Sequence, residues 1–204
     1  MLAKEPVAGR VKTRLCPPCT PEQAADLAAA ALADTLEATL AVGADRVLLA
    51  LDGEPGPWVP AGVTVVGQGR GSFDRRLAHS WSHASGPAVQ IGMDTPQVTA
   101  ELLATAAEAL GRPDTDAVLG RADDGGWWAI GLRRADARVF MGVPTSRPDT
   151  ADRQRARLFE LGLRTRALPV LRDVDCFEDA VVVAAQAPST RFSRALARLP
   201  VGVA

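Results

Sequence analysis

The sequence of 204 residues predicts a single-domain α/β fold, in which helices cover both faces of a mostly parallel sheet. Three observations favour this fold class. Short apolar runs alternate with helix-type segments along the chain, no Ser/Gly-rich linker divides it, and 47% hydrophobic with 23% charged residues is ordinary for a globular protein.

The first helix is expected within the alanine-rich stretch that ends near residue 44. Thr20 is a suitable N-cap, Pro21 suits the first helical position, Gln23 completes a capping box, and Gly43 marks the exit. Acidic residues interrupt this stretch, so it is not expected to cross a membrane.

The remaining elements follow from apolar runs and helical periodicity. Thr95 is expected to cap the helix at 97–110, with Pro96 at its first position. Strands are predicted at 47–51, 63–66, 88–92, 117–120, 127–132 and 166–171, and helices at 73–84, 97–110, 150–161, 177–187 and 189–199.

The first strand is expected to be short, because only Met1, Leu2 and Ala3 precede the basic segment that begins at Lys4. Phosphate-binding loops usually follow a complete buried strand. We therefore expect a truncated first strand, with its missing part upstream of Met1.

Charge and cysteine content narrow the class of partner. A net charge of −1 provides no overall field for nucleic acid, and no apolar run approaches the ~20 residues of a membrane span. The three cysteines, Cys16, Cys19 and Cys176, fit a reducing cytoplasm better than a disulfide framework. We expect a cytoplasmic protein that binds neither nucleic acid nor membrane.

The most unusual local feature is the basic segment near the N-terminus. Of 23 Lys and Arg residues, only Lys4 and Lys12 are lysine, and Arg10 and Arg14 lie beside them. These four cations, with Gly9 allowing close backbone approach, could bind a polyphosphate. The alternative is a solvated basic terminus.

Acidic residues follow two other predicted strands. Asp94 comes directly after residues 88–92, where a carboxylate can reach a divalent metal; alternatively, it only favours the next helix N-terminus. Asp173 and Asp175 alternate along an extended segment, so a cation between them would offset their repulsion. Their alternative roles are pairing of Asp173 with an arginine and helix capping by Asp175.

A third acidic segment combines Asp124 with Gly125, Gly126, Trp127 and Trp128. The glycines permit close approach to a ligand, and one tryptophan could stack on a base or a sugar while the other packs in the core. A β-turn followed by two structural tryptophans is the plain alternative.

These motifs together resemble the DUF2064 group. The resemblance rests on residues 4–15, 92–96, 124–132 and 173–175, in this order along nearly the whole chain. That group is labelled glycosyltransferase-like, belongs to the nucleotide-diphospho-sugar transferase superfamily with its Rossmann-like GT-A fold, and is similar to the phospholactate guanylyltransferases.

The resemblance implies roles for particular residues. Phosphate binding and catalysis fall to Lys12 and Arg14, helped by Lys4, Gly9 and Arg10. Asp94, Asp173 and Asp175 would bind Mg²⁺ or Mn²⁺, with Asp94 also catalytic. Asp124, Gly125 and Gly126 would line the acceptor or sugar side, and Trp127 would bind the nucleotide or the substrate. Gln68, Gly69 and Arg76 match another family stretch, without an assigned role.

Three residues, at two places in the sequence, depart from the family pattern. Met93 stands where serine is usual, and Trp127 with Trp128 replace tyrosines. The sequence therefore leaves open a nucleotide-binding relative with little or no turnover.

The expected reaction is metal-dependent transfer of a nucleoside monophosphate from a nucleoside triphosphate to a small phosphorylated or hydroxylated acceptor, with pyrophosphate leaving. Glycosyl transfer from a nucleotide-diphosphate sugar is an alternative, and non-catalytic nucleotide binding is another. The acceptor, the base and the oligomeric state do not follow from the sequence.

Overall fold

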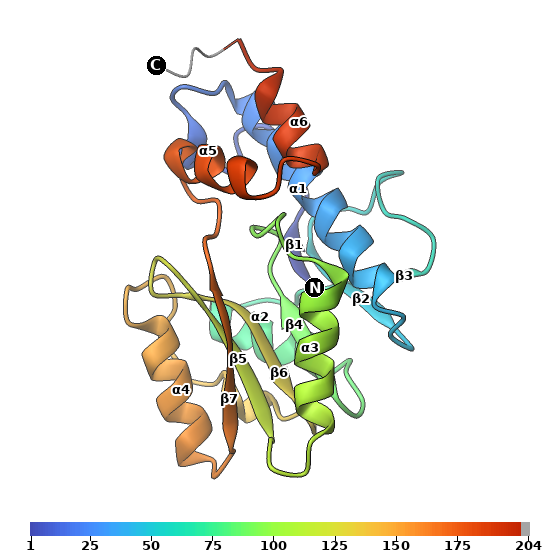
Figure 1. Cartoon of the computed structure of the whole chain (residues 1–204), viewed down its shortest axis with the longest axis vertical. Coiled ribbons are helices and arrows are strands. Elements are labelled where there is room, and N and C mark those ends of the chain that lie inside the picture. Colours follow the sequence, from blue (N-terminus) through green and yellow to red (C-terminus); the bar gives the residue numbers. More distant parts are fainter. Residues whose placement is uncertain (201–204) are drawn as a thin grey trace.

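The computed structural model describes residues 1–200, whose strands form two sheets (Figure 1). The first is wholly parallel, in the order β1-β2-β3. The second has the order β4-β6-β5-β7. The strands are β1 (Leu2–Lys4), β2 (Val47–Asp52), β3 (Val63–Gly67), β4 (Ala88–Ile91), β5 (Ala117–Ala122), β6 (Trp127–Leu132) and β7 (Thr165–Leu171).

The prediction of a mostly parallel α/β fold is confirmed, with one reversed strand. β6 is antiparallel to both β4 and β5, whereas β5 and β7 are parallel. A tight turn joins β5 to β6, and the amide of Ala122 donates to the carbonyl of Gly126 at 2.8 Å. β4, β5 and β7 therefore end at the same edge of the sheet, where β6 begins.

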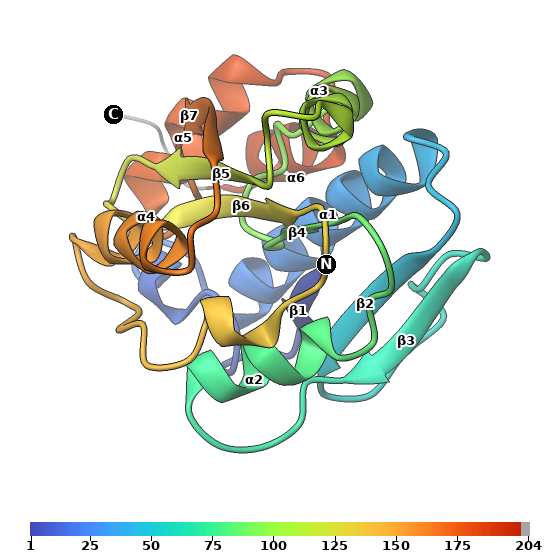
Figure 2. The same ribbon diagram turned by 90° about the horizontal axis from the view of Figure 1, so that it is seen from below.

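Helices lie on both sides of the strands (Figure 2). α1 (Pro21–Ala41) and α3 (Ala100–Gly111) cover one side, and α2 (Phe73–Trp81) and α4 (Thr150–Glu160) cover the other. α5 (Phe177–Gln186) and α6 (Arg191–Ala197) pack against the first half of α1 in a separate apolar cluster that includes Leu15, Leu27 and Phe192. Two 3₁₀ turns, η1 (Thr13–Leu15) and η2 (Ala137–Val139), complete the described part.

The predicted boundaries of α1 are confirmed. The Gln23 amide donates to Thr20 Oγ1 at 3.3 Å, and the Thr20 amide donates to Gln23 Oε1 at 2.8 Å, which forms the expected capping box. Gly43 follows the helix with a φ of 73°, a conformation that glycine adopts readily.

The predicted start of α3 is wrong. Thr99, not Thr95, caps this helix and accepts from the Leu102 amide at 3.2 Å. Pro96 and Val98 are buried, and a turn in which the Val98 amide donates to the Thr95 carbonyl places them there. Because Thr99 offers the same capping chemistry after this turn, the helix begins four residues later than Thr95 would allow.

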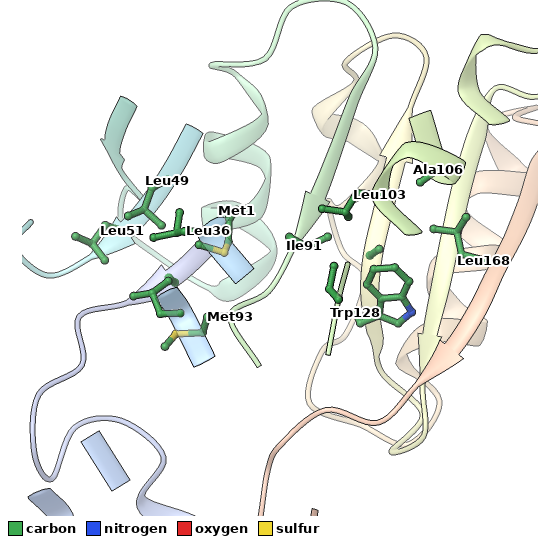
Figure 3. Close-up of a cluster of buried hydrophobic side chains, with 14 of the residues drawn as sticks. Met1, Leu36, Leu49, Leu51, Ile91, Met93, Leu103, Ala106, Trp128 and Leu168 are labelled. Carbon is green, nitrogen blue, oxygen red and sulfur yellow. The ribbon is translucent and has the colours of Figure 1, made fainter. Parts of the chain in front are cut away.

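Apolar clusters join the two sheets, and Figure 3 shows one of them. Leu36 and Leu49 lie on the side of the parallel sheet, and Ile91, Leu103 and Trp128 lie on the side of the mixed sheet. The short strand β1 pairs with β2 at this junction, with Leu2 opposite Ala50. Shared burial fixes the ends of β1 and β4 relative to each other, and the candidate site lies at those ends.

Candidate active site

A cleft of about 670 Å³ opens at the carboxyl ends of several strands. The basic segment follows β1, Asp94 follows β4, Asp124 follows β5, and Asp173 follows β7. Ligands in open α/β sheets bind at this edge, so the position matches the usual place of an active site.

Ten of the twelve residues predicted for the site line this cleft. They are Lys4, Arg10, Lys12, Arg14, Asp94, Asp124, Gly126, Trp127, Asp173 and Asp175. Gly9 does not line it; it has a φ of 73° in a turn closed by a hydrogen bond from the Arg10 amide to the Val7 carbonyl. The left-handed conformation of this turn, and not contact with the cleft, accounts for glycine here.

Lys12 is held by two partners inside the cleft. Its Nζ lies 2.5 Å from Asp94 Oδ1 and also donates to the carbonyl of Val174. The side chain of Lys12 is only 11% exposed, against 44% for Asp94. A solvated basic terminus is therefore not what the structure shows at Lys12.

The other cations of the segment are more exposed. Arg14 Nη1 pairs with Asp175, and both side chains are largely accessible. Lys4 and Arg10 line the cleft without an ion pair to any residue in 1–200. Arg76 and Arg147 line it as well, so six basic side chains face four carboxylates, an excess that suits an anionic ligand.

Asp173 is the carboxyl group that its surroundings perturb most within the cleft. Burial raises its pKa most, the neighbouring carboxylates of Asp124 and Asp94 add to the rise, and Lys12 opposes it, so that the pKa lies at about 6. Asp173 forms no ion pair with any arginine in the described chain. The carboxylates of Asp94, Asp124 and Asp173 thus lie close enough to repel one another.

Asp175, the third carboxylate of the predicted metal set, also lines the cleft, where it pairs with Arg14. Asp124 is a further carboxylate close enough to raise the pKa of Asp173. Asp175 does not cap α5, because Asp179 accepts from the Cys176 amide there. Arg14 lies 161 positions away, so no local pattern could reveal this pairing.

The donor chemistry fits Mg²⁺ or Mn²⁺, although residues 1–200 contain no cluster of three or more His, Cys, Asp or Glu side chains with metal-binding geometry. Mg²⁺ commonly uses one or two carboxylates and completes its shell with water and substrate phosphate. Asp94 and Asp173 are such hard oxygen donors, and a cation beside Asp173 would offset the burial and the neighbouring carboxylates that raise its pKa.

The tight turn before β6 serves both structure and site. Asp124 Oδ1 accepts from the Gly126 amide at 2.7 Å, and Trp127 lines the cleft. Trp128 is buried in the core, and its indole Nε1 donates to the Pro169 carbonyl at 2.9 Å. The predicted division between one ligand-facing and one core tryptophan matches this arrangement.

Gly125 does not line the cleft as predicted. Its φ is +89°, and a Cβ atom there would lie 1.9 Å from the Pro148 carbonyl oxygen. The segment before α4 packs directly on this glycine, and the Ala151 amide donates to its carbonyl at 2.8 Å. This backbone contact, together with the positive φ, accounts for glycine here.

We expect Gly125→Ala to lower the free energy of unfolding by at least ~2 kcal/mol, because a left-handed alanine and a backbone clash add together. Gly142→Ala is the matched control, since Gly142 has a similar φ of +75° with no atom within 4 Å of a Cβ. Urea denaturation of both variants measures the difference. Equal losses would show that the Pro148 contact has no energetic weight.

The sequence analysis missed one wall of the cleft. Residues 145–148, just before α4, and Thr150, the first residue of α4, form it. The Arg147 amide donates to Thr150 Oγ1 at 3.1 Å, which helps to hold this irregular segment. The polar run between Pro144 and Pro148 was the available indication of a functional loop.

Gln68 and Arg76 form a polar support beside the cleft. Gln68 is buried, its Nε2 donates to the Ala3 carbonyl at 2.6 Å, and its Oε1 accepts from Arg76 Nη1 at 2.9 Å. Arg76 also approaches Asp52 at 3.5 Å. These contacts tie β1, β2 and α2 together where the basic segment begins.

Met93, the departure from the family serine, is a core residue. It is 5% exposed, and its Sδ accepts from the Lys4 amide at 3.2 Å. The thioether thus links the segments after β1 and β4.

Asp173→Asn should stabilise the protein in a pH-dependent way, with a chelator present. The pKa of Asp173, about 6, exceeds the ordinary value, so the folded state binds more protons than the unfolded state between pH ~4 and ~6. Stability falls as Asp173 ionises, and asparagine avoids that cost.

At pH 8 we expect a gain of about 1 kcal/mol after solvent screening, or roughly 2–4 °C in Tm. The gain should shrink at pH 5. Asp123→Asn, outside the cleft lining, is the control, and thermal melts at both pH values provide the measurement. A gain that is larger at pH 5 would contradict this interpretation.

The comparison with protein families decides the relationship. Residues 25–147 match the family described as "Uncharacterized protein conserved in bacteria (DUF2064)". The chain belongs to the DUF2064 family. No curated protein matches it. The resemblance found from the motifs is thereby confirmed.

Solved structures of the same fold extend this result for the DUF2064 chain. A protein from Desulfovibrio desulfuricans G20, provisionally assigned as a nucleotide-diphospho-sugar transferase, is 24% identical, with a TM-score of 0.84 over 96% of this chain and 92% of its own. CMP:2-keto-3-deoxy-manno-octonic acid synthetase, solved with CTP, is 14% identical, with a TM-score of 0.56 over 92% of this chain and 96% of its own.

A third structure, Rv0371c of Mycobacterium tuberculosis H37Rv in complex with manganese, is 22% identical. Its TM-score is 0.52, over 89% of this chain and 95% of its own. At these identities the three structures establish a shared fold. A separate finding is that no helix in residues 1–200 is long and apolar enough to span a membrane.

Proposed function

We propose that this DUF2064 protein is a metal-dependent nucleotidyltransferase. It transfers a nucleoside monophosphate from a nucleoside triphosphate to a small phosphorylated or hydroxylated acceptor. The observation that carries the proposal is the meeting of Lys12 with Asp94 in a cleft that also contains Asp124, Asp173 and further basic side chains. The cleft provides cations for phosphate and, beside them, oxygen donors for a divalent cation.

The comparisons support this proposal without deciding the reaction. The synthetase of the same fold was solved with CTP, and Rv0371c was solved with manganese. Both ligands agree with the residue types in the cleft of the present chain. We place the protein in the cytoplasm, because Cys16, Cys19 and Cys176 are free thiols.

The protein groups would act mainly by electrostatics. Lys4, Arg10, Lys12 and Arg14 bind the triphosphate and reduce the repulsion that an incoming anionic or hydroxyl acceptor meets at the α-phosphorus. Asp94 and Asp173 would hold Mg²⁺ or Mn²⁺, which supplies charge neutralisation when bound. Trp127 offers an aromatic face toward the cleft, and the turn at Asp124 and Gly126 borders the space for the acceptor.

Glycosyl transfer is the second candidate, and one finding favours it. The D. desulfuricans protein, with the TM-score of 0.84, has a provisional assignment as a nucleotide-diphospho-sugar transferase. The same cations could bind a diphosphate, and Trp127 could stack on a sugar ring.

The two reactions differ in the leaving group. Purified protein is incubated with Mg²⁺, each α-³²P-labelled nucleoside triphosphate, and pools of small phosphorylated or hydroxylated acceptors. Nucleotidyl transfer predicts pyrophosphate and a labelled acceptor product. A parallel series with nucleotide-diphosphate sugars tests glycosyl transfer, which releases a nucleoside diphosphate. Product only in that series would overturn the proposal.

A further inference from the structure

The structure pairs the cation expected to bind phosphate with a carboxylate expected to bind metal. Lys12 Nζ lies 2.5 Å from Asp94 Oδ1, and Lys12 is 11% exposed. Each member of this pair satisfies the other's charge in a partly dehydrated place. A ligand of opposite charge at either group competes with this contact for the same charge.

The surrounding backbone allows this contact to loosen without disorder of the segment. The Val174 amide donates to the Asp94 carbonyl at 2.8 Å, and the Val174 carbonyl accepts from Lys12 Nζ. Lys12 therefore keeps one partner when it leaves the Asp94 carboxylate. Val174 is itself buried, and its backbone contacts both Asp94 and Lys12.

We propose that Lys12 and Asp94 exchange partners: a divalent cation takes the Asp94 carboxylate while a triphosphate takes the Lys12 ammonium. This inference rests on the proposed function and assigns a further role to the same cleft. Metal alone would leave Lys12 beside a dication, and triphosphate alone would leave Asp94 beside a polyanion. When both ligands bind, each charge gains a counter-charge, so the two ligands bind with positive cooperativity.

The first test is binding of Mn²⁺ to nucleotide-free protein, followed by electron paramagnetic resonance. Lys12→Met removes the cation that competes for Asp94, and we expect it to bind Mn²⁺ about tenfold more tightly than wild type. Lys4→Met is the matched control, because Lys4 lines the same cleft without a carboxylate partner in residues 1–200. Its affinity should change less than about threefold. Equal gains in Mn²⁺ affinity for the two variants would mean that only the overall positive charge of the cleft matters, which would overturn the exchange.

A reciprocal test removes the carboxylate instead of the cation. Inorganic tripolyphosphate is titrated by calorimetry in the presence of a chelator. Asp94→Asn frees Lys12 and should bind it about tenfold more tightly than wild type, whereas Asp124→Asn should show a smaller gain. The gain should disappear in the double variant Lys12→Met/Asp94→Asn. If the gain persists there, Lys12 is not the exchanging group.

These tests separate the inference from the proposed function. Wild-type protein that binds Mn²⁺ with a nucleoside triphosphate, while Lys12→Met fails to tighten Mn²⁺ binding, overturns the exchange alone. Wild-type protein that binds neither Mn²⁺ nor any triphosphate overturns both.

Discussion

Asp94→Asn should lower kcat/KM for nucleotidyl transfer by about 10²-fold or more while the fold remains intact. The side chain lies 44% exposed in the cleft, where it meets Lys12 and raises the pKa of Asp173. Asparagine keeps the shape and loses the charge that would hold a divalent cation. The transfer assay with labelled triphosphate measures the loss.

Asp123→Asn is the control for this effect. Asp123 neighbours Asp124 in sequence but pairs with Arg172 at 3.2 Å and does not line the cleft. Its activity should stay within about twofold of wild type, as is usual for surface changes. If Asp94→Asn retained a third of the activity, the assignment of the site would be wrong.

Trp128→Ala should produce the largest loss of stability, about 3–5 kcal/mol in the free energy of unfolding. The indole is 2% exposed and covers Gly120, where a Cβ atom would lie 2.5 Å from the ring. The substitution opens a cavity in the cluster that joins the sheets and leaves the Pro169 carbonyl without its donor. Urea denaturation measures this change.

Trp127→Ala separates the neighbouring roles. Trp127 is partly exposed at the cleft, so we expect a loss below ~2 kcal/mol together with weaker nucleotide binding. Similar losses of stability from both variants, with unchanged binding, would contradict the division between a core and a ligand-facing tryptophan.

The sequence predicted the convergence of the site for a simple geometrical reason. Lys12, Asp94, Asp124 and Asp173 each follow a strand, and the carboxyl ends of parallel strands meet at one edge. The reversal of β6 could have been predicted as well. The predicted strands at 117–120 and 127–132 leave six residues between them, too few for a parallel crossover.

The contacts that the sequence could not reveal have a different origin. Asp175 pairs with Arg14, and Gly125 accommodates Pro148, so both roles depend on residues distant in the chain. Thr95 and Thr99 are equally suitable caps, and burial of Pro96 and Val98 decides between them. The wall at 145–148 belongs to an irregular segment, which has no periodicity to read.

The most direct test of the central claim, that the cleft binds a nucleoside triphosphate together with a divalent metal, is a thermal-shift panel. Wild type and Asp94→Asn are melted with each nucleoside triphosphate or nucleotide-diphosphate sugar, with and without Mg²⁺. A ligand at 100 times its Kd adds ~2.7 kcal/mol, or roughly 5–10 °C. We predict a rise with a triphosphate that depends on Mg²⁺ in wild type, and we predict that Asp94→Asn loses this Mg²⁺ dependence. A rise in Tm with nucleotide sugars alone, or no rise with any ligand, would contradict the claim.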